Sequence, residues 1–298
     1  MRSLIYLLYL LSASVLSGCV TVKPIYPEKF ELSDKMRERV EQARSKDEAR
    51  AITRSLDGKQ LFSNMGNTKN EALRTSLSRC SSMSGGACHV LAVGKLDFTE
   101  RYKQFNEESS RAIRSLRIPT QNADYFEKMD WQIDEPDHIR SANEGIHFAT
   151  PSHLEGVKNI LTAELIAGMK EEKFILLDAS TMDFDSGKTL PNAYVMDWLG
   201  VSYQTDSKTP GADTFSQVAL EANMRTLAPQ KDQAIVVFCA SPECWLSVNG
   251  LMRLRALGYT NLYWYRGGSS VWSALGLPLV PQVPYASLRH QTTLNPSK

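Results

Sequence analysis

Residues 235–245 read Ile-Val-Val-Phe-Cys-Ala-Ser-Pro-Glu-Cys-Trp. The apolar run predicts a buried strand that ends at Cys239, and the residues after it predict a short loop leading into a helix. Amide groups at a helix N-terminus are unpaired donors at the positive end of the helix dipole, and they lower the pKa of a thiol placed there. Cys239 is therefore the candidate nucleophile. The alternative interpretation is a small buried cysteine that merely ends a strand.

The rest of the chain places this stretch in a recognisable order of motifs. Downstream of the helix come Gly258-Tyr259, an expected strand over 261–265, Gly267-Gly268, Trp272 and Gly276-Leu277-Pro278. Upstream, an apolar strand over 174–178 ends in Asp178, and Leu190-Pro191-Asn192-Ala193 forms an expected turn. As an ordered set, these motifs resemble the rhodanese-like family over about residues 150–285.

The resemblance implies an α/β fold with a parallel sheet flanked by helices, and a cysteine that carries a persulfide sulfur. The alternation of expected helices (161–169 and 215–227) with expected strands (174–178 and 234–238) supports the same fold class independently. Cys239 then lies at the carboxyl end of a parallel strand, where such sheets place their ligands. A smaller α+β region is expected in the N-terminal part of the chain.

The cysteine loop departs from the family pattern in its charge. It contains no cation, and Glu243 opposes an anionic donor such as thiosulfate. Pro242 lacks an amide proton, which removes one donor from the loop. A phosphatase on this scaffold needs Arg where this chain has Trp245, so we exclude that activity.

Five residues are candidates for contacts with a substrate, although we expect Trp245 to be mainly a core or lid residue. They are Ala240, Ser241, Glu243, Trp245 and, at the end of the first core strand, Asp178.

Cys244 is the second cysteine of the loop, and two interpretations of it stay open. It is either a resolving thiol in a redox or sulfur-transfer cycle, or half of a static disulfide with Cys239. The Cys-Trp pair also resembles, more loosely, the secreted CXXCW-motif proteins associated with PQQ-dependent (quinoprotein) catabolism. The two cysteines of this chain are further apart than in that motif.

The N-terminus predicts the compartment. Residues 1–18 resemble a bacterial lipoprotein signal peptide, in which Arg2 precedes an apolar run and a small-residue cleavage site. Cys19 then becomes the lipidated first residue of the mature chain, followed by a tether over 19–33. The apolar run is shorter than a membrane span of about 20 residues. Because Val20 is not Asp, we expect attachment at the periplasmic face of the outer membrane.

Residues 34–117 are expected to form a small α+β module. Thr68 and Glu71 form a capping box at the start of a helix, and a strand follows over 90–93. Cys80 and Cys88 flank a glycine turn, and in an exported protein we expect them to form a disulfide. Metal ligation by these two cysteines with His89 is the alternative.

The remaining segments carry weaker signals. The residues 35–56 predict one charged helix and 99–116 another, while 118–149 read as an acidic linker or partner-facing wrap. Solvated acids are favoured there over a calcium site. Residues 286–298 form an expected tail. With 34 basic and 33 acidic residues, the charge indicates no nucleic-acid partner. We expect no metal and no cofactor.

Three functions are compatible with this sequence. The first is a cell-envelope sulfurtransferase that carries a persulfide on Cys239 and exchanges sulfur with a small donor or acceptor. The second is a thiol-disulfide protein that cycles Cys239 and Cys244 with a periplasmic redox protein. The third is a non-catalytic rhodanese-like binding module that serves a periplasmic quinoprotein system.

Overall fold

The computed structural model describes residues 23–27, 30–45, 49–121, 123–141, 144–200 and 214–285. Its larger sheet is parallel, with strand order β5-β10-β9-β6-β8. These strands are β5 (Val157–Asn159), β6 (Ile175–Asp178), β8 (Ala193–Val195), β9 (Ile235–Phe238) and β10 (Leu262–Tyr265). The strand that leads into Cys239 therefore lies in the middle of the sheet, between β10 and β6.

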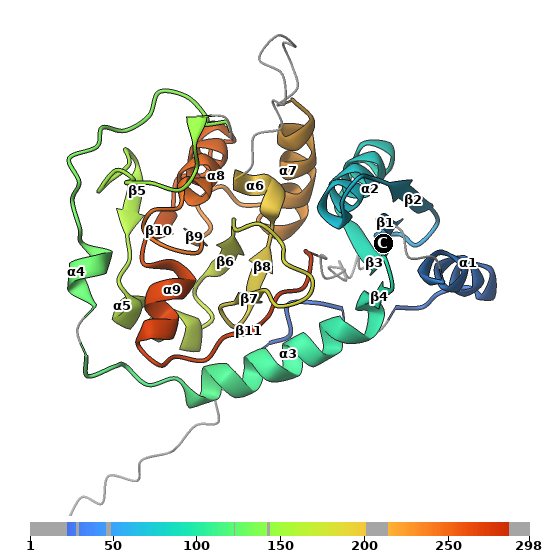
Figure 1. Ribbon diagram of the computed structural model, residues 1–298, viewed down its shortest axis with the longest axis horizontal. Coiled ribbons are helices and arrows are strands. Elements are labelled where there is room, and N and C mark those ends of the chain that lie inside the picture. Colours follow the sequence, from blue (N-terminus) through green and yellow to red (C-terminus); the bar gives the residue numbers. More distant parts are fainter. Residues whose placement is uncertain are drawn as a thin grey trace, which may run out of the picture.

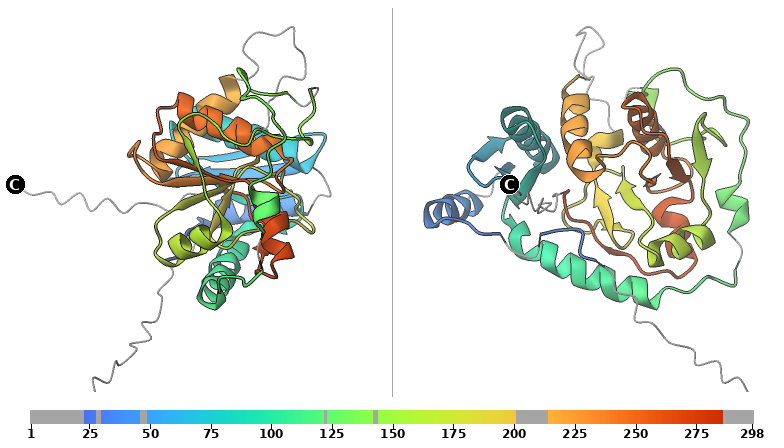
Figure 2. Two further views of the ribbon diagram at one scale, coloured as in Figure 1. Left: turned by 90° about the vertical axis from the view of Figure 1, so that its left-hand side faces the viewer. Right: turned by 180° about the vertical axis from the view of Figure 1, so that it is seen from behind.

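Helices cover both faces of this sheet (Figures 1 and 2). The helices α5 (Thr162–Lys170) and α9 (Gly268–Ala274) cover one face. The other face is covered by α6 (Asp197–Gly200), α7 (Thr214–Leu227) and α8 (Trp245–Ala256). Side chains alternate between faces, so Val236 packs in the α5 cluster while Val237 packs with α8. The expected α/β fold with a helix-flanked parallel sheet is confirmed.

The N-terminal module contains an antiparallel sheet with strand order β2-β1-β3-β4. Its elements are α1 (Asp34–Arg44), β1 (Arg50–Ser55), β2 (Leu61–Met65), α2 (Lys69–Ser84), β3 (Cys88–Val93), β4 (Leu96–Asp97) and α3 (Phe98–Ser115). The first half of the expected capping box is present, because the Thr68 hydroxyl accepts from the Glu71 amide, but the Glu71 carboxylate accepts from the amide of Asn67, one residue before the N-cap, instead of from Thr68.

Two predictions for this module were wrong. The single helix expected over 35–56 ends at Arg44, and residues 50–55 form β1 instead. Pairing on both sides with β2 and β3 buries Ile52 and outweighs the local charged pattern. The expected tether is also partly folded: Tyr26 is fully buried, and its backbone amide and carbonyl both bond to the Asn106 side chain.

The module and the larger sheet share one hydrophobic core. The long helix α3 runs beneath both parts (Figure 1), and Tyr102 on it donates to the Pro284 carbonyl at 2.8 Å. The short strands β7 (Lys188–Thr189) and β11 (Val280–Pro281) pair antiparallel near this helix. Among the described residues, none of the helices combines the length and apolar character needed to cross a membrane.

The expected linker over 118–149 wraps around the outside of the larger sheet (Figure 1). It contains the short helix α4 (Asp124–Glu127). The carboxylate of Glu127 is buried and accepts hydrogen bonds from both the amide and the hydroxyl of Thr162, at the start of α5. Further along, Glu135 forms an ion pair with Arg255 at 2.7 Å. The segment is therefore docked on the domain through specific side chains, and it positions residues beside the cysteine loop.

Candidate functional site

The cysteine loop, residues 239–244, joins the carboxyl end of β9 to the N-terminus of α8. Cys239 and Cys244 form a disulfide, with their Cα atoms 6.0 Å apart. Both side chains are buried, at 2% and 1% exposure. Cys244 is the N-cap of α8. The loop thus closes on itself at the edge of the sheet where a ligand is expected.

In this oxidised form the loop amides bind protein acceptors. The amide of Glu243 donates to the Ser241 hydroxyl at 3.3 Å, and that of Cys244 donates to the Ser241 carbonyl at 3.1 Å. The amide of Trp245 donates to the Ile146 carbonyl at 3.0 Å. These three amides are therefore not available to the expected cradle around a Cys239 thiolate in the closed loop. Such a cradle requires reduction of the disulfide and rearrangement of these bonds.

A segment that we call the strap, residues 144–150, crosses the cysteine loop. Its Phe148 amide donates to the Glu243 carbonyl at 3.0 Å, and the Thr150 hydroxyl donates to the Pro242 carbonyl at 2.6 Å. Together with the Trp245 amide bond to the strap, these contacts form an antiparallel pairing that includes a bridge between His147 and Cys244. The strap therefore covers the disulfide.

Trp245 anchors the strap. Its indole N–H donates to the Ala149 carbonyl at 3.1 Å, and its ring lies 5.1 Å from that of Phe148. The guanidinium of Arg140 lies over both rings, 4.1 Å from the Trp245 centroid and 4.4 Å from the Phe148 centroid. Such cation–π contacts each contribute about 0.5–1 kcal/mol at exposed sites. Trp245 is 1% exposed, so it is a core residue in this form of the protein.

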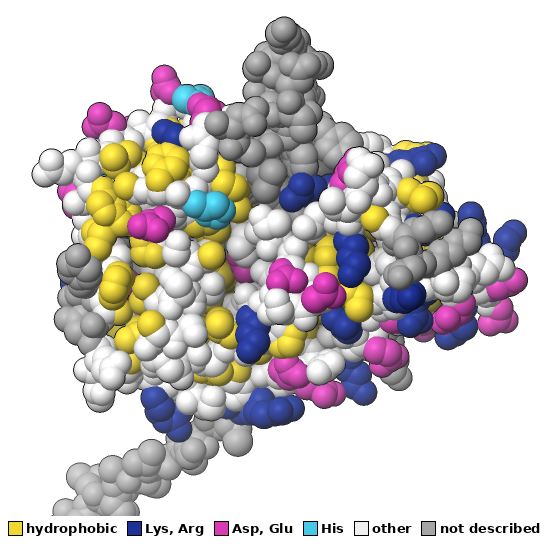
Figure 3. All heavy atoms as spheres, viewed as in Figure 1, with side chains coloured by type: hydrophobic (Ala, Val, Ile, Leu, Met, Phe, Trp, Pro, Cys, Tyr) yellow, Lys and Arg dark blue, Asp and Glu magenta, His cyan; other side chains and the backbone are white. Residues whose placement is uncertain are grey.

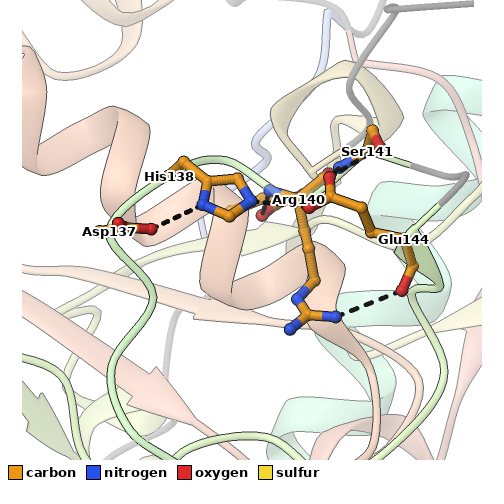
Figure 4. A network of polar contacts seen from close by, with 6 residues as sticks. Asp137, His138, Arg140, Ser141 and Glu144 are labelled. Atoms are coloured by element: carbon orange, nitrogen blue, oxygen red, sulfur yellow. Dashed lines mark hydrogen bonds and ion pairs between the residues drawn. The ribbon is translucent and has the colours of Figure 1, made fainter. Parts of the chain in front are cut away.

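Arg140 belongs to a polar cluster that we call the hook, residues 137–141 and 144 (Figure 4). His138 lies between two carboxylates, 2.6 Å from Asp137 and 2.7 Å from Glu144. Hydrogen bonds to both carboxylates raise the pKa of His138. The amide and hydroxyl of Ser141, together with His138, lower the pKa of Glu144 to about 2. The hook therefore holds Arg140 in place over the strap.

The hook is also attached to α8. The amide of Arg140 donates to the side-chain oxygen of Asn249, and the Asn249 amide group donates back to the Arg140 carbonyl, both at 2.9 Å. Because Asn249 is fully buried, this reciprocal pair fixes the backbone of the hook against the helix that begins at the cysteine loop.

The cysteine loop itself contains no cation. A buried cation, Arg266, lies directly after β10. Its guanidinium donates to the Thr150 carbonyl and hydroxyl at 3.1 and 3.3 Å and to the Met129 carbonyl. It also lies 4.8 Å from the centroid of Trp131. Burial lowers the pKa of Arg266. Sequence reasoning missed this residue, although a cation at the end of a strand next to β9 was the available signal.

The paired glycines expected after β10 hold the far side of the loop. Gly268 has a φ of +62°, and a Cβ there would collide with the Cys239 carbonyl oxygen. The amides of Ser269 and Ser270, at the start of α9, donate to the carbonyls of Cys239 and Ala240 at 3.1 and 2.8 Å. The second glycine is therefore required by close backbone approach.

The predicted contact residues separate into two groups. Ser241 and Glu243, with Pro242, line a cavity of about 400 Å³, and Ala240 is exposed beside them. Three further residues complete the cavity, and the sequence analysis did not single them out. They come from residues 118–149, the segment that we call the wrap, and are Phe126, Met129 and Trp131.

Asp178 and Trp245 are instead buried. Asp178 accepts hydrogen bonds from the Ser180 and Thr189 hydroxyls, each at 2.6 Å, and burial raises its pKa. It therefore braces the strand end away from the cavity.

The second cysteine pair lies in the N-terminal module. Cys80 and Cys88 form a disulfide with Cα atoms 6.2 Å apart, and both are fully buried. Among the described residues, no group of three or more His, Cys, Asp or Glu side chains is arranged to hold a metal ion. The predicted lipidation site, Cys19, lies outside the described residues.

Residues 161–275 match the family described as rhodanese-like domain. The chain therefore carries a rhodanese-like domain over these residues, as its motifs indicated. No protein with a curated description is significantly similar to it in sequence.

Solved structures to which part of this chain is similar include a thiosulfate sulfurtransferase from Pseudomonas aeruginosa, at 18% identity and a TM-score of 0.32. That match covers 43% of this chain and only 21% of the Pseudomonas chain. A human single-domain sulfurtransferase is 21% identical, with a TM-score of 0.29, and the match covers 40% of this chain and 96% of the human one. The rhodanese-like domain of an Anabaena protein is 18% identical with a TM-score of 0.28, covering 45% and 89%.

Proposed function

We propose that this protein transfers sulfur through Cys239, with Cys244 as the thiol that releases it. The observation that carries the proposal is the disulfide between these two residues, within one loop at the carboxyl end of β9. A resolving thiol must reach the sulfur of the nucleophile, and here the two sulfurs are already bonded. The disulfide is then the state left after sulfur has been released.

The cycle balances in three steps. The Cys239 thiolate attacks the outer sulfur of an organic persulfide, so that Cys239 gains a persulfide and the donor leaves as a thiolate. The Cys244 thiolate then attacks the inner sulfur, the Cys239–Cys244 bond forms, and hydrosulfide leaves with the electron pair of the broken S–S bond. An external dithiol reduces the loop disulfide and is itself oxidised to a disulfide.

The loop disfavours a dianionic donor such as thiosulfate. Glu243 lines the cavity beside the loop, and its carboxylate repels anions. Among the described residues that contact the strap and the wrap, Arg266 is the one buried cation. Its guanidinium already donates hydrogen bonds to Thr150 and Met129. We therefore propose that the donor is an organic persulfide.

A single-turnover experiment tests this cycle. Reduced wild-type protein, freed of reductant and mixed with a small organic persulfide, should release about one hydrosulfide per chain and end with the loop disulfide. The Cys244→Ser variant should stop with one extra sulfur atom on the loop peptide, seen by mass spectrometry. Cys239→Ser should release nothing above the buffer rate.

The matched control is the Cys80→Ala/Cys88→Ala variant, which removes the other disulfide and should release sulfide as the wild type does. Sulfide release by Cys239→Ser at the wild-type rate would refute the proposal.

A second function is favoured by the burial of both loop sulfurs beneath the strap. In it the disulfide is static, and the rhodanese-like domain binds a partner of a periplasmic quinoprotein or redox system without catalysis. A reduction potential below about −300 mV for Cys239–Cys244 would mark a structural bond, whereas a higher value would fit a cycling thiol pair.

For the location, we propose a lipoprotein anchored through Cys19 at the periplasmic face of the outer membrane. The support is the sequence of residues 1–19. Metabolic labelling with a fatty acid should be lost in Cys19→Ala, and recovery of the labelled protein in the inner-membrane fraction would contradict the outer-membrane placement.

A further inference from the structure

The cavity beside the cysteine loop has the size and lining of a ligand pocket. We call it the loop pocket, and it is lined by Phe126, Met129, Trp131, Ser241, Pro242 and Glu243. Its volume of about 400 Å³ lies within the range of small-molecule sites. Figure 3 shows hydrophobic side chains gathered over the part of this face where α4 and β10 lie, with an acidic side chain among them.

The walls of the loop pocket are held in place by Arg266. Its guanidinium binds the Met129 carbonyl and lies against the ring of Trp131, which fixes the wrap side. It also binds Thr150, whose hydroxyl holds the Pro242 carbonyl on the loop side. One buried side chain therefore sets the distance between the two walls. A pocket fixed in this way loses little conformational entropy when a ligand binds.

The chemistry of the walls is apolar with one negative charge. Phe126 and Trp131 present aromatic rings, and Glu243 is the one charged residue of the lining. The Glu243 side chain is exposed and has no ion-pair partner among the described residues. Among the described contacts Arg266 forms no ion pair with Glu243, because its guanidinium donates to Thr150 and Met129. Aromatic faces and a carboxylate together attract an organic cation.

We propose that the loop pocket binds a small organic amine or ammonium ion with an apolar body. The apolar part would lie against Phe126 and Trp131, and the cation would pair with Glu243. Three of the six lining residues lie between Cys239 and Cys244, so a bound ligand contacts the loop that the disulfide closes. If the proposed sulfur transfer holds, the pocket selects a cationic aminothiol persulfide as donor; the binding itself does not depend on that reaction.

Three probes with the same phenylethyl or phenylmethyl body test the pocket: phenethylamine, 2-phenylethanol and phenylacetate. Binding is measured by calorimetry and ligand-observed NMR on the oxidised full chain, in which no sulfur transfer takes place. The amine should bind roughly tenfold more tightly than the alcohol, from the combined ion pair and cation–π contact. The carboxylate should bind more weakly than the alcohol.

Variants separate the two contributions. Glu243→Gln should reduce the affinity for the amine toward that of the alcohol, leaving only the cation–π part of the difference, whereas Glu221→Gln, which changes an exposed carboxylate on α7, should have no effect. Trp131→Ala should lose binding of all three probes while keeping the wild-type circular dichroism spectrum. Equal affinity for amine and carboxylate, or an unchanged amine affinity in Glu243→Gln, would overturn the proposal.

The Cys239→Ser variant distinguishes this inference from the proposed function. It should bind the amine as the wild type does, although it releases no sulfide. If the wild type releases sulfide but does not bind the amine, the pocket proposal alone is refuted. Intact binding with no sulfide release would refute the sulfur-transfer cycle alone.

Discussion

The two disulfides of this chain are buried to nearly the same extent, but different kinds of structure cover them. Cys80 and Cys88 join the end of α2 to the start of β3, inside the core of the N-terminal module. Cys239 and Cys244 close a loop at a sheet edge, beneath the strap. The first lies among regular helix and sheet, whereas the loop that holds the second pairs with the strap, whose described residues include no named helix or strand.

This difference matters because proteins open locally before they unfold globally. A segment held by a few side-chain contacts opens at a lower free energy than packed helices and strands do. The strap depends on Trp245, Arg140 and a small number of backbone bonds, so its opening should expose the loop disulfide while Cys80–Cys88 stays buried. Burial alone therefore does not tell a structural disulfide from a reactive one.

The largest expected effect comes from removing the strap anchor. Trp245→Ala deletes a fully buried ring together with its contacts to Phe148 and Arg140, and should lower the free energy of unfolding by about 3–5 kcal/mol. It should also accelerate reduction of Cys239–Cys244 relative to Cys80–Cys88. Denaturant titration measures the first effect, and alkylation with peptide mapping measures the second.

Trp245→Phe serves as the milder variant, since it keeps most of the packing and loses the hydrogen bond to the Ala149 carbonyl. Its cost should be about 1 kcal/mol. If both disulfides were reduced faster to the same degree in Trp245→Ala, the strap would have no special role in protecting the loop.

An intermediate effect is expected from removing each disulfide in turn. The bridges span 8 and 5 residues, and chain entropy predicts a similar cost for both, on the order of 2–3 kcal/mol. Cys80→Ala/Cys88→Ala and Cys239→Ala/Cys244→Ala should therefore lose similar stability, but only the second should lose sulfide release. If both double variants lost stability and did not differ in sulfide release, the two disulfides would be functionally equivalent.

The smallest expected effect is a pH dependence of the hook. Because the folded protein raises the pKa of His138, the contribution of its protonated form is complete below the ordinary value of about 6.5 and is lost as pH rises through the raised pKa. Glu144 has the opposite sign: its contribution is present above its ordinary pKa and is lost as pH falls toward about 2. Strap protection should therefore weaken as pH rises above about 6.5 and through the raised pKa of His138.

Because His138 is largely exposed, the change should be less than about threefold. The measurement is the ratio of the reduction rates of the two disulfides with a phosphine reductant across this range. In His138→Gln the ratio should no longer depend on pH, while His153→Gln, outside the hook, should behave as the wild type.

Sequence patterns predicted three of the five strands of the larger sheet, β6, β9 and β10, and missed the two edge strands β5 and β8. The strand before Cys239, the helix after it and the Gly-Gly pair follow from local apolar runs and glycine positions, and all three are present. Asn192, expected in the turn after Pro191, takes a φ of +58°, which fits its tolerance for the left-handed region. The pattern failed at 50–55, where pairing with β2 and β3 overrode a charged, helix-like sequence.

The candidate site was only half predictable for a related reason. Ser241 and Glu243 were identifiable because they lie next to Cys239 in the chain. Phe126, Trp131 and Arg266 reach the same place through the fold, from positions at least 22 residues away in the sequence from either cysteine. No local pattern records such a contact.

The sequence by itself determined that this chain has a strand ending in a cysteine, a loop with a second cysteine, and a helix, because strand and helix formation depend on neighbouring residues. Only the tertiary structure decided that the two cysteines close the loop, that residues 144–150 cover it, and that Arg266 fixes a pocket beside it. The strap and Arg266 contacts join segments distant in the chain, and the closure of the loop depends on how β9 and α8 hold its two ends, so the geometry of all three is set by packing the whole domain.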